Sequence, residues 1–135
     1  MYNRILVALV PDQSRPAQRA LEAARALCSP GGRIVALHVV EEVSPYVETY
    51  LGEQHLEKAS AQALVELSDV IKGIEKAEPV VVVGHAARTI LEYAGQNNVD
   101  CIVVASHRPE FADYLIGSTA GRVVRHAECS VHVVR

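Results

Sequence analysis

Residues 101–119 read CIVVASHRPEFADYLIGST, and this stretch decides the fold of the chain. Its opening, 101–105, is a short apolar run typical of a buried strand. The loop 106–117 follows, and residues from 118 to about 127 have the spacing of an amphipathic helix. Strand, loop and helix in this order form the repeating unit of α/β proteins. Glycine and hydroxyl residues at such a helix start often hold a phosphate group.

The rest of the chain repeats this alternation of strand and helix. A first helix is expected between the capping residue Ser14 and the stop signal SPGG at 29–32. Residues 41–52 have no clear period and contain Pro45 and Gly52, so we expect a loop or a lid there. The strands are expected at 4–10, 33–40, 79–83, 101–105 and 130–134, and the later helices at 53–76, 86–97 and 118–127.

This order predicts one α/β domain, residues 1–135, built on a five-stranded parallel sheet with helices on both faces. Such sheets bind ligands beyond the carboxyl ends of their strands, where the strand order reverses. The loops after the first and fourth strands, 11–13 and 106–117, are therefore the candidate site. The last strand, 130–134, would offer unpaired backbone to a second copy if it lies at the sheet edge.

Charge and composition exclude several classes of protein. The net charge is −3, and no basic face suited to nucleic acid is evident. The longest apolar run, 79–83, is far too short to cross a bilayer. Three cysteines without metal-type spacing, and no export signal, predict a cytoplasmic protein. Residues 41–78 carry nine acids and three lysines, which form a solvated helix face or a docking patch for a regulatory protein partner.

Familiar catalytic and nucleotide motifs are absent from the sequence. There is no GxxxxGK[ST], GxGxxG, GxSxG or HExxH pattern. His38, at a strand end, is expected to make a structural hydrogen bond. What remains is Gly117-Ser118-Thr119, where free N–H groups, the helix dipole and two hydroxyls attract an anion, although these residues also serve as an ordinary helix cap. His107 and Arg108 stand on the same loop, either folded over a phosphate or solvated.

Five segments together resemble the universal stress protein family, over nearly the whole chain. The closing segment is the most specific of them, and the run ASHRP resembles the F/G-type branch of the family. The segments are RILVALV (4–10), ALHVVEE (36–42), GHAA followed by Ile90-Leu91 (84–91), DCIVVAS (100–106) and LIGSTAGRVVRHAECSVHVVR (115–135).

The resemblance implies a flavodoxin-like, Rossmann-like three-layer sandwich, often dimeric through the last strand. It also implies ATP binding by a loop of form G-x2-G-x9-G-[ST]. Carried onto this chain, the two leading glycines fall on Ala105 and Arg108, the closing pair falls on Gly117-Ser118, and the spacer is one residue short. Val10 stands where the family has a nucleoside-binding Asp, and Asp12 is the nearby substitute.

We therefore expect a stress-response or signalling protein that binds ATP or AMP, with Mg²⁺ as a possible companion ion. The base would lie between Leu9-Val10 and Val39, where the family contacts adenine through the backbone. The alternative is a nucleotide-free dimeric interaction module. A slow ATPase would need His107 or Asp113 to position water, and no catalytic constellation supports an enzyme. The phosphates would lie on Ser106, His107, Arg108, Gly117, Ser118 and Thr119, beside Ala105.

Overall fold

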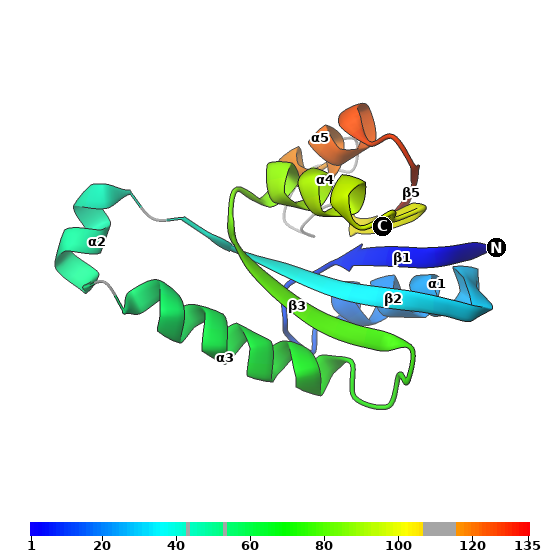
Figure 1. Cartoon of the computed structure of the whole chain (residues 1–135), viewed down its shortest axis with the longest axis horizontal. Helices are drawn as coiled ribbons and strands as arrows, with labels where there is room; N and C mark the ends of the chain where they lie inside the picture. The colour runs from blue at the N-terminus through cyan, green and yellow to red at the C-terminus, as the bar shows by residue number, and fades with distance from the viewer. Residues whose placement is uncertain (43, 53, 107–115) are drawn as a thin grey trace.

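The computed structural model of the chain describes residues 1–42, 44–52, 54–106 and 116–135. Five parallel strands form one sheet in the order β3-β2-β1-β4-β5, so β3 and β5 lie at its edges (Figure 1). The elements are β1 Tyr2–Ala8, α1 Arg15–Leu27, β2 Cys28–Glu41, α2 Pro45–Leu51, α3 His55–Val70, β3 Ala77–Gly84, α4 Ala86–Gln96, β4 Cys101–Ala105, α5 Ser118–His126 and β5 Ser130–Val134.

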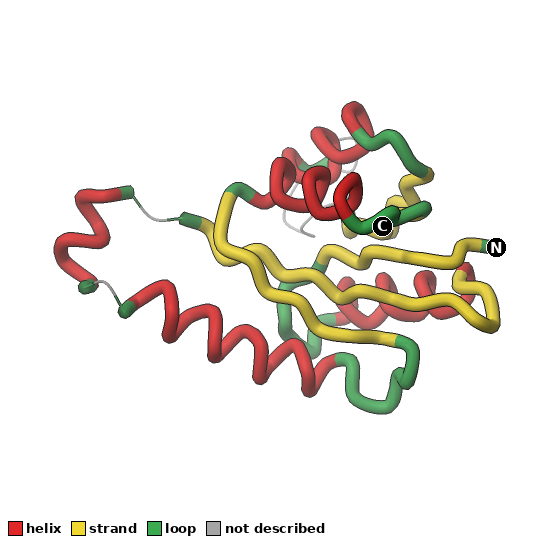
Figure 2. The backbone as a smooth tube through the Cα atoms, viewed as in Figure 1, coloured by secondary structure: helices red, strands yellow, loops and turns green. Residues whose placement is uncertain are grey.

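Helices cover both faces of the sheet. On one face α1 and α3 pack against the alternate β1 residues Ile5 and Val7, and on the other face α4 and α5 pack around Leu6 (Figure 2). All three β1 side chains are fully buried, and each such burial stabilises the fold by about 1.5–3 kcal/mol. The three-layer α/β sandwich predicted from the sequence is confirmed.

The start of β1 is held by a carboxylate from the residue directly before β4. Asp100 accepts hydrogen bonds from the backbone N–H groups of Asn3 and Arg4, at 2.9 and 3.0 Å. Strand β1 runs from Tyr2 to Ala8, two residues earlier at each end than the predicted 4–10. Leu9 and Val10 therefore lie beyond the strand, at its carboxyl end.

The second strand is longer than the sequence predicted. The helix α1 does end before the SPGG segment, as expected, but β2 begins at Cys28 and includes residues 29–32. Cys28 pairs with Tyr2, whereas Arg33 already pairs with Arg4, so the SPGG residues bulge out of the register. The glycines and proline interrupt the pairing locally without ending the strand.

Two predictions about the middle of the chain were wrong. Residues 45–51 form the helix α2, where the sequence predicted a loop or lid over 41–52. Pro45 sits at the first helical position, where its missing N–H costs nothing. The next helix, α3, ends at Val70 instead of 76, because Gly73 adopts a positive φ of 93° that breaks the helical path.

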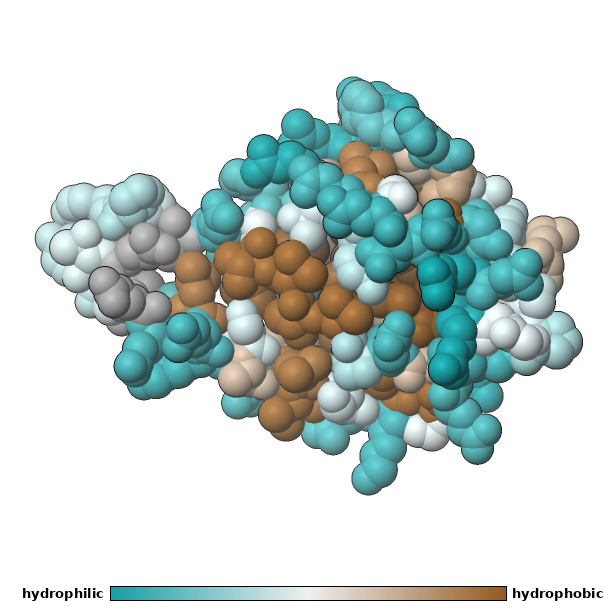
Figure 3. All heavy atoms as spheres, viewed as in Figure 1, coloured by the Kyte–Doolittle hydropathy of each residue, from teal (hydrophilic) through white to brown (hydrophobic). Residues whose placement is uncertain are grey.

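The edge strand β3 keeps part of its apolar surface open. Its residues Val80, Val81 and Val82 are partly buried, and Val83 is exposed. Figure 3 shows apolar side chains gathered over the middle of this face of the molecule. Pro79, which lacks an N–H group, fits an edge position in a sheet.

Candidate functional site

The carboxyl ends of β1, β2 and β4 lie together where the strand order changes direction. From β1 the chain passes to β2 on one side, and later to β4 on the other side of β1. In parallel α/β sheets this switch point is the usual place for a ligand. The structure therefore confirms that the predicted loops 11–13 and 106–117 leave from neighbouring strands, although most of the second loop lies outside the described residues.

A cavity of about 1010 Å³ opens at this switch point, which is large enough for a nucleotide-sized ligand. It is lined by the ends of the three strands and by the starts of α1, α4 and α5. The lining residues are Ala8, Leu9, Val10, Asp12, Ser14, Pro16, Ala17, Ala20, Leu37, His38, Val39, Glu41, Ala86, Ile90, Val104, Ala105, Ser106, Ile116, Gly117, Ser118, Thr119 and Ala120.

The cavity brings together most of the residues predicted for the site. His107 and Arg108 lie outside the described residues. The others come from four separate segments of the chain, and that they bind a ligand stays a prediction. The predicted site residues on the cavity wall are Leu9, Val10, Val39, Ala105, Ser106, Gly117, Ser118 and Thr119.

The start of α5 is fixed against the end of β4. The N–H of Gly117 donates to the carbonyl oxygen of Ser106. Ser106 is 3% exposed, and its own N–H donates to the carbonyl of Val134 in β5 at 2.8 Å. A side chain at Gly117 would place its Cβ 2.8 Å from the Ser106 carbonyl oxygen. Glycine is therefore required here by the close approach of two backbone segments.

Three helices begin at the cavity, and side chains already cap two of them. Ser14 caps α1 by accepting from the Ala17 N–H at 3.4 Å. Glu41, at the end of β2, accepts from the Ala86 N–H at the start of α4, at 3.3 Å. At α5 the cap residue is Gly117, which makes no side-chain cap hydrogen bond.

This difference makes the start of α5 the candidate place for an anion. The first N–H groups of a helix lack intrahelical acceptors, and they carry about half a positive charge at the helix end. Within the described part of the lining, the start of α5 is where these donors have no capping side chain. Ser118 and Thr119 add two hydroxyl groups at the same place.

The structure adds two carboxylates to the lining that were not among the predicted site residues. Asp12, which the sequence offered only as a substitute for the missing family Asp, lines the cavity and accepts from the Ser14 N–H at 3.0 Å. Glu41 lines it from β2, and its carboxylate lies 4.0 Å from His85 Nδ1. The position of Glu41 directly after an apolar strand was the available sequence signal.

The remaining lining is mostly apolar. Leu37, Val39 and Ile90 form its wall on the β2 and α4 side. His38 also lines the cavity, and its Nδ1 lies 3.2 Å from the Leu9 carbonyl oxygen, so the structural hydrogen bond predicted for it is confirmed. A flat, largely apolar group could pack on this wall while an anionic group lies at α5.

Comparisons with known proteins agree with this geometry. A model of the universal stress protein family matches residues 1–135. The chain belongs to the universal stress protein family. The resemblance that its five segments suggested is thereby confirmed. Universal stress protein A homolog 2 of Coxiella burnetii is 33% identical over 99% of this chain and 95% of its own length.

Solved structures extend the comparison to three dimensions. The hypothetical protein MJ0577 is 26% identical to this universal stress protein, with a TM-score of 0.83 over 99% of this chain and 96% of its own. A family protein from Arabidopsis thaliana, solved with AMP bound, is 20% identical, with a TM-score of 0.65 over 98% of this chain and 90% of its own. The second likeness shows a shared fold.

Two kinds of feature are absent from the described residues. Helices long and apolar enough to span a membrane are absent from these parts of the chain. Within the same residues, no group of three or more His, Cys, Asp or Glu side chains is placed to hold a metal ion.

Proposed function

We infer that this universal stress protein binds an adenine nucleotide, with a phosphate on the start of α5. The observation that carries the proposal is the glycine cap at Gly117, which leaves the α5 N-terminus open beside Ser118 and Thr119. His107 and Arg108, on the loop before α5, are proposed to add charge-assisted contacts to the phosphate.

We propose a pose for the rest of the ligand that follows the strand order. The phosphate lies at α5, which follows β4, and β1 separates β4 from β2. Neighbouring strands are about 4.8 Å apart, so the end of β2 lies roughly 10 Å from that of β4. A nucleoside monophosphate is long enough to cross this span. Its sugar would lie over the end of β1, near Asp12, and its base over β2, between Leu9-Val10 and Val39.

The AMP-bound Arabidopsis structure supports this ligand at the level of the shared fold. The charges on the described lining help to choose among nucleotides. Asp12 and Glu41 both contribute carboxylates. Their negative charge disfavours an uncompensated triphosphate. We therefore propose AMP, or ATP accompanied by Mg²⁺, as the ligand. We propose that the protein signals in the cytoplasm according to whether a nucleotide is bound, and that it catalyses no reaction.

Calorimetric titration tests the proposal. Protein freed of nucleotide is titrated with AMP, with ATP and Mg²⁺, and with AMP in high salt. We expect saturable binding with a dissociation constant on the order of micromolar, which corresponds to about 8 kcal/mol. Added salt should weaken it, because the phosphate contact is electrostatic. The absence of saturable heat with either nucleotide at millimolar concentration would rule the function out.

A nucleotide-free interaction module is the second candidate. The observation that favours it is α2, whose Tyr46 and Tyr50 are largely exposed. Strand β5, at a sheet edge, is proposed to pair with its twin in a homodimer. The two candidates are separated by the titration above, since an interaction module would bind no nucleotide but would still associate.

A further inference from the structure

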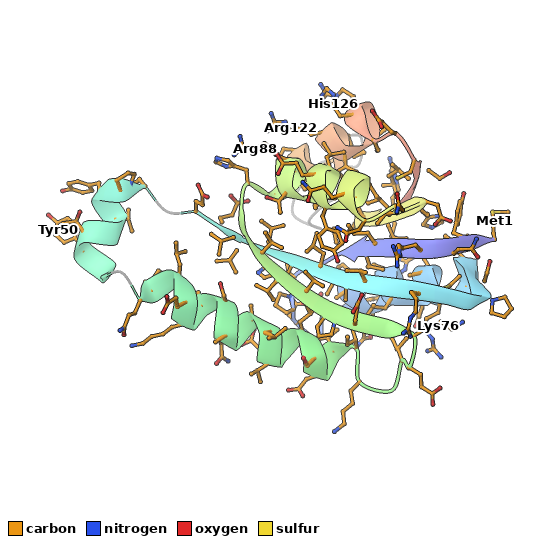
Figure 4. The ribbon with its side chains drawn as sticks, in the orientation of Figure 1. Met1, Tyr50, Lys76, Arg88, Arg122 and His126 are labelled. Carbon is orange, nitrogen blue, oxygen red and sulfur yellow. The ribbon has the colours of Figure 1, made fainter. Side chains whose placement is uncertain are left out.

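The helix α2 carries a prominent pair of aromatic side chains away from the sheet. Tyr46 is 72% exposed and Tyr50 is 74% exposed. Their ring centroids lie 5.2 Å apart in an edge-to-face arrangement, and their hydroxyl oxygens are 3.3 Å apart. Figures 1 and 4 show α2 at one end of the molecule, with Tyr50 pointing outward. Two exposed tyrosines at such a position are typical anchors of a protein interface.

Acidic residues flank this aromatic pair on both sides. Residues 42–57 contain four glutamates and neither lysine nor arginine. Glu42 and Glu57 are exposed, and neither forms an ion pair with another described residue. We call Glu42, α2 and Glu57 the acidic arm. Its combination of aromatic rings and uncompensated negative charge fits a surface rich in arginine, because guanidinium groups bind carboxylates and also stack on tyrosine rings.

The same chain presents such a surface elsewhere. Arg88 on α4 and Arg122, Arg125 and His126 on α5 are all exposed, and we call them the basic face. The helices α4 and α5 pack against each other. No arginine of the basic face has an ion pair with a described residue. The helix α5 contains no acidic residue, and Glu92 is the acid of α4.

The acidic arm and the basic face of one molecule lie apart. In Figure 4, Tyr50 is at one end of the molecule, and Arg122 and His126 are on the outer side of the two helices. Two copies related by a two-fold axis would make this contact twice, arm to face and face to arm, which closes the assembly. We propose that the acidic arm docks on the basic face of a second copy of this chain.

Cysteine cross-linking between two differently tagged pools tests the contact directly. One pool carries Thr49→Cys on α2, and the other carries His126→Cys on α5. A short bis-maleimide is added to the mixture, with the partly exposed Cys28 and Cys129 replaced by serine in every pool. A third pool with Ala26→Cys, an exposed position on α1, replaces the His126→Cys pool as the control. We expect the mixed 49–126 product to exceed the 49–26 product at least tenfold, and to fall as salt screens the charges.

Three pairs of substitutions test the contact in the same cross-linking pools: two that remove it, one on each side, and one that restores it. Tyr46→Ser with Tyr50→Ser in the arm pool should abolish the mixed product. Arg122→Glu with Arg125→Glu in the face pool should do the same. Glu42→Arg with Glu57→Arg in the arm pool should then restore it. The proposal is overturned if the 49–126 product does not exceed the control. It is also overturned if the product persists undiminished when both tyrosines and both arginines are replaced. These readouts depend on neither the nucleotide nor pairing through β5.

Discussion

Gly117 is the residue on which the proposed phosphate site depends most. Its φ of −57° is open to any residue, so steric crowding by the Ser106 carbonyl, and not backbone conformation, is what excludes a side chain. Gly117→Ala must push α5 away from β4. We expect AMP affinity to fall about tenfold or more, equivalent to about 1.4 kcal/mol, in a calorimetric titration.

Gly95→Ala is the matched control for this substitution. A Cβ at Gly95, on the exposed side of α4, meets nothing within 4 Å. The change should leave AMP binding intact and stabilise the fold by up to about 1 kcal/mol, because alanine favours a helix over glycine. Equal AMP affinity in the two variants would show that the start of α5 does not hold the phosphate.

Asp12 is expected to position the sugar of the ligand. One carboxylate oxygen accepts from the Ser14 N–H, which fixes the side chain at the end of β1. A charged acceptor contributes about 1.5–3 kcal/mol when it bonds a ribose hydroxyl. Wild-type protein should therefore prefer AMP over 2′-deoxy-AMP, and Asp12→Asn should reduce that preference. Competition binding with both nucleotides measures it, and an unchanged preference in the variant would contradict the assignment.

Cys101 makes stability depend on pH in the alkaline range. Burial raises the pKa of its thiol from 9.0 to about 11, and the nearby Cys129 and Asp100 add to the rise. Below pH 9 the thiol is protonated in both folded and unfolded chains. Between about pH 9 and about pH 11 the unfolded chain loses its proton first, so stability falls as pH rises. Urea unfolding should show a steeper fall for wild type than for Cys101→Ala. If the free energy of unfolding fell equally with pH in the two proteins, the prediction would be disproved.

The sequence predicted which residues line the cavity better than it predicted which contacts their side chains make. Gly117, Ser118 and Thr119 were found because a strand, a loop and a hydroxyl-rich helix start are adjacent in the chain. Glu41 depends on its side chain meeting a helix start 45 residues away in sequence, in the bond with Ala86. No local pattern predicts such a contact.

At the scale of single elements, α4 owes part of its stability to Glu41. The carboxylate lies at the positive end of the helix and accepts from its first N–H group. Glu41→Ala should cost about 0.3–1 kcal/mol of unfolding free energy, and Glu41→Gln less, because the amide oxygen still accepts. Glu42→Ala, which has no such helix contact, is the control. If Glu42→Ala lowered the free energy of unfolding more than Glu41→Ala in a denaturant titration, the capping role of Glu41 would be refuted.

The strands and helices were predictable where their apolar period was strong. The bounds of β4 and β5 agree with those predicted, since each is a compact apolar run. The helix α2 was missed because its apolar face is not buried against the sheet, so no stripe marks it. The bulge at residues 29–32 was missed because Gly and Pro are signals for the end of a helix and also for the end of a strand. The pairing of Cys28 with β1 is what extends β2 to the far side of the bulge.

At the scale of the whole molecule, β5 is expected to form a homodimer. The Val134 carbonyl accepts from Ser106, so it faces β4. Alternate residues point their backbone groups to opposite sides, so those of Val131 and Val133 face the open edge. Val131→Pro removes an edge N–H without breaking a bond to β4. In salt high enough to screen the contact between acidic arm and basic face, sedimentation at tens of micromolar should show the wild-type protein as a dimer and this variant as a folded monomer, checked by circular dichroism. A monomeric wild type would contradict the expectation.

The order of elements along the chain was sufficient for the overall architecture. Alternating strands and helices leave few ways to cover a parallel sheet on both faces, and apolar runs at β1 and β4 place the central strands. What the sequence could not predict is the charge inside the cavity. That charge includes the Glu41 carboxylate, which accepts from a helix start 45 residues away in sequence, and we propose that it helps to select the nucleotide.

The central claim, that the α5 start holds an adenine nucleotide, is tested most directly by what the purified protein carries. Protein isolated without added nucleotide is denatured, and the released small molecules are separated by anion exchange with mass detection. The account predicts AMP or ATP in near-stoichiometric amount from wild-type protein, and much less from Gly117→Ala. Wild-type protein that releases no nucleotide, and that then fails to bind AMP or Mg²⁺-ATP in titration, would contradict it.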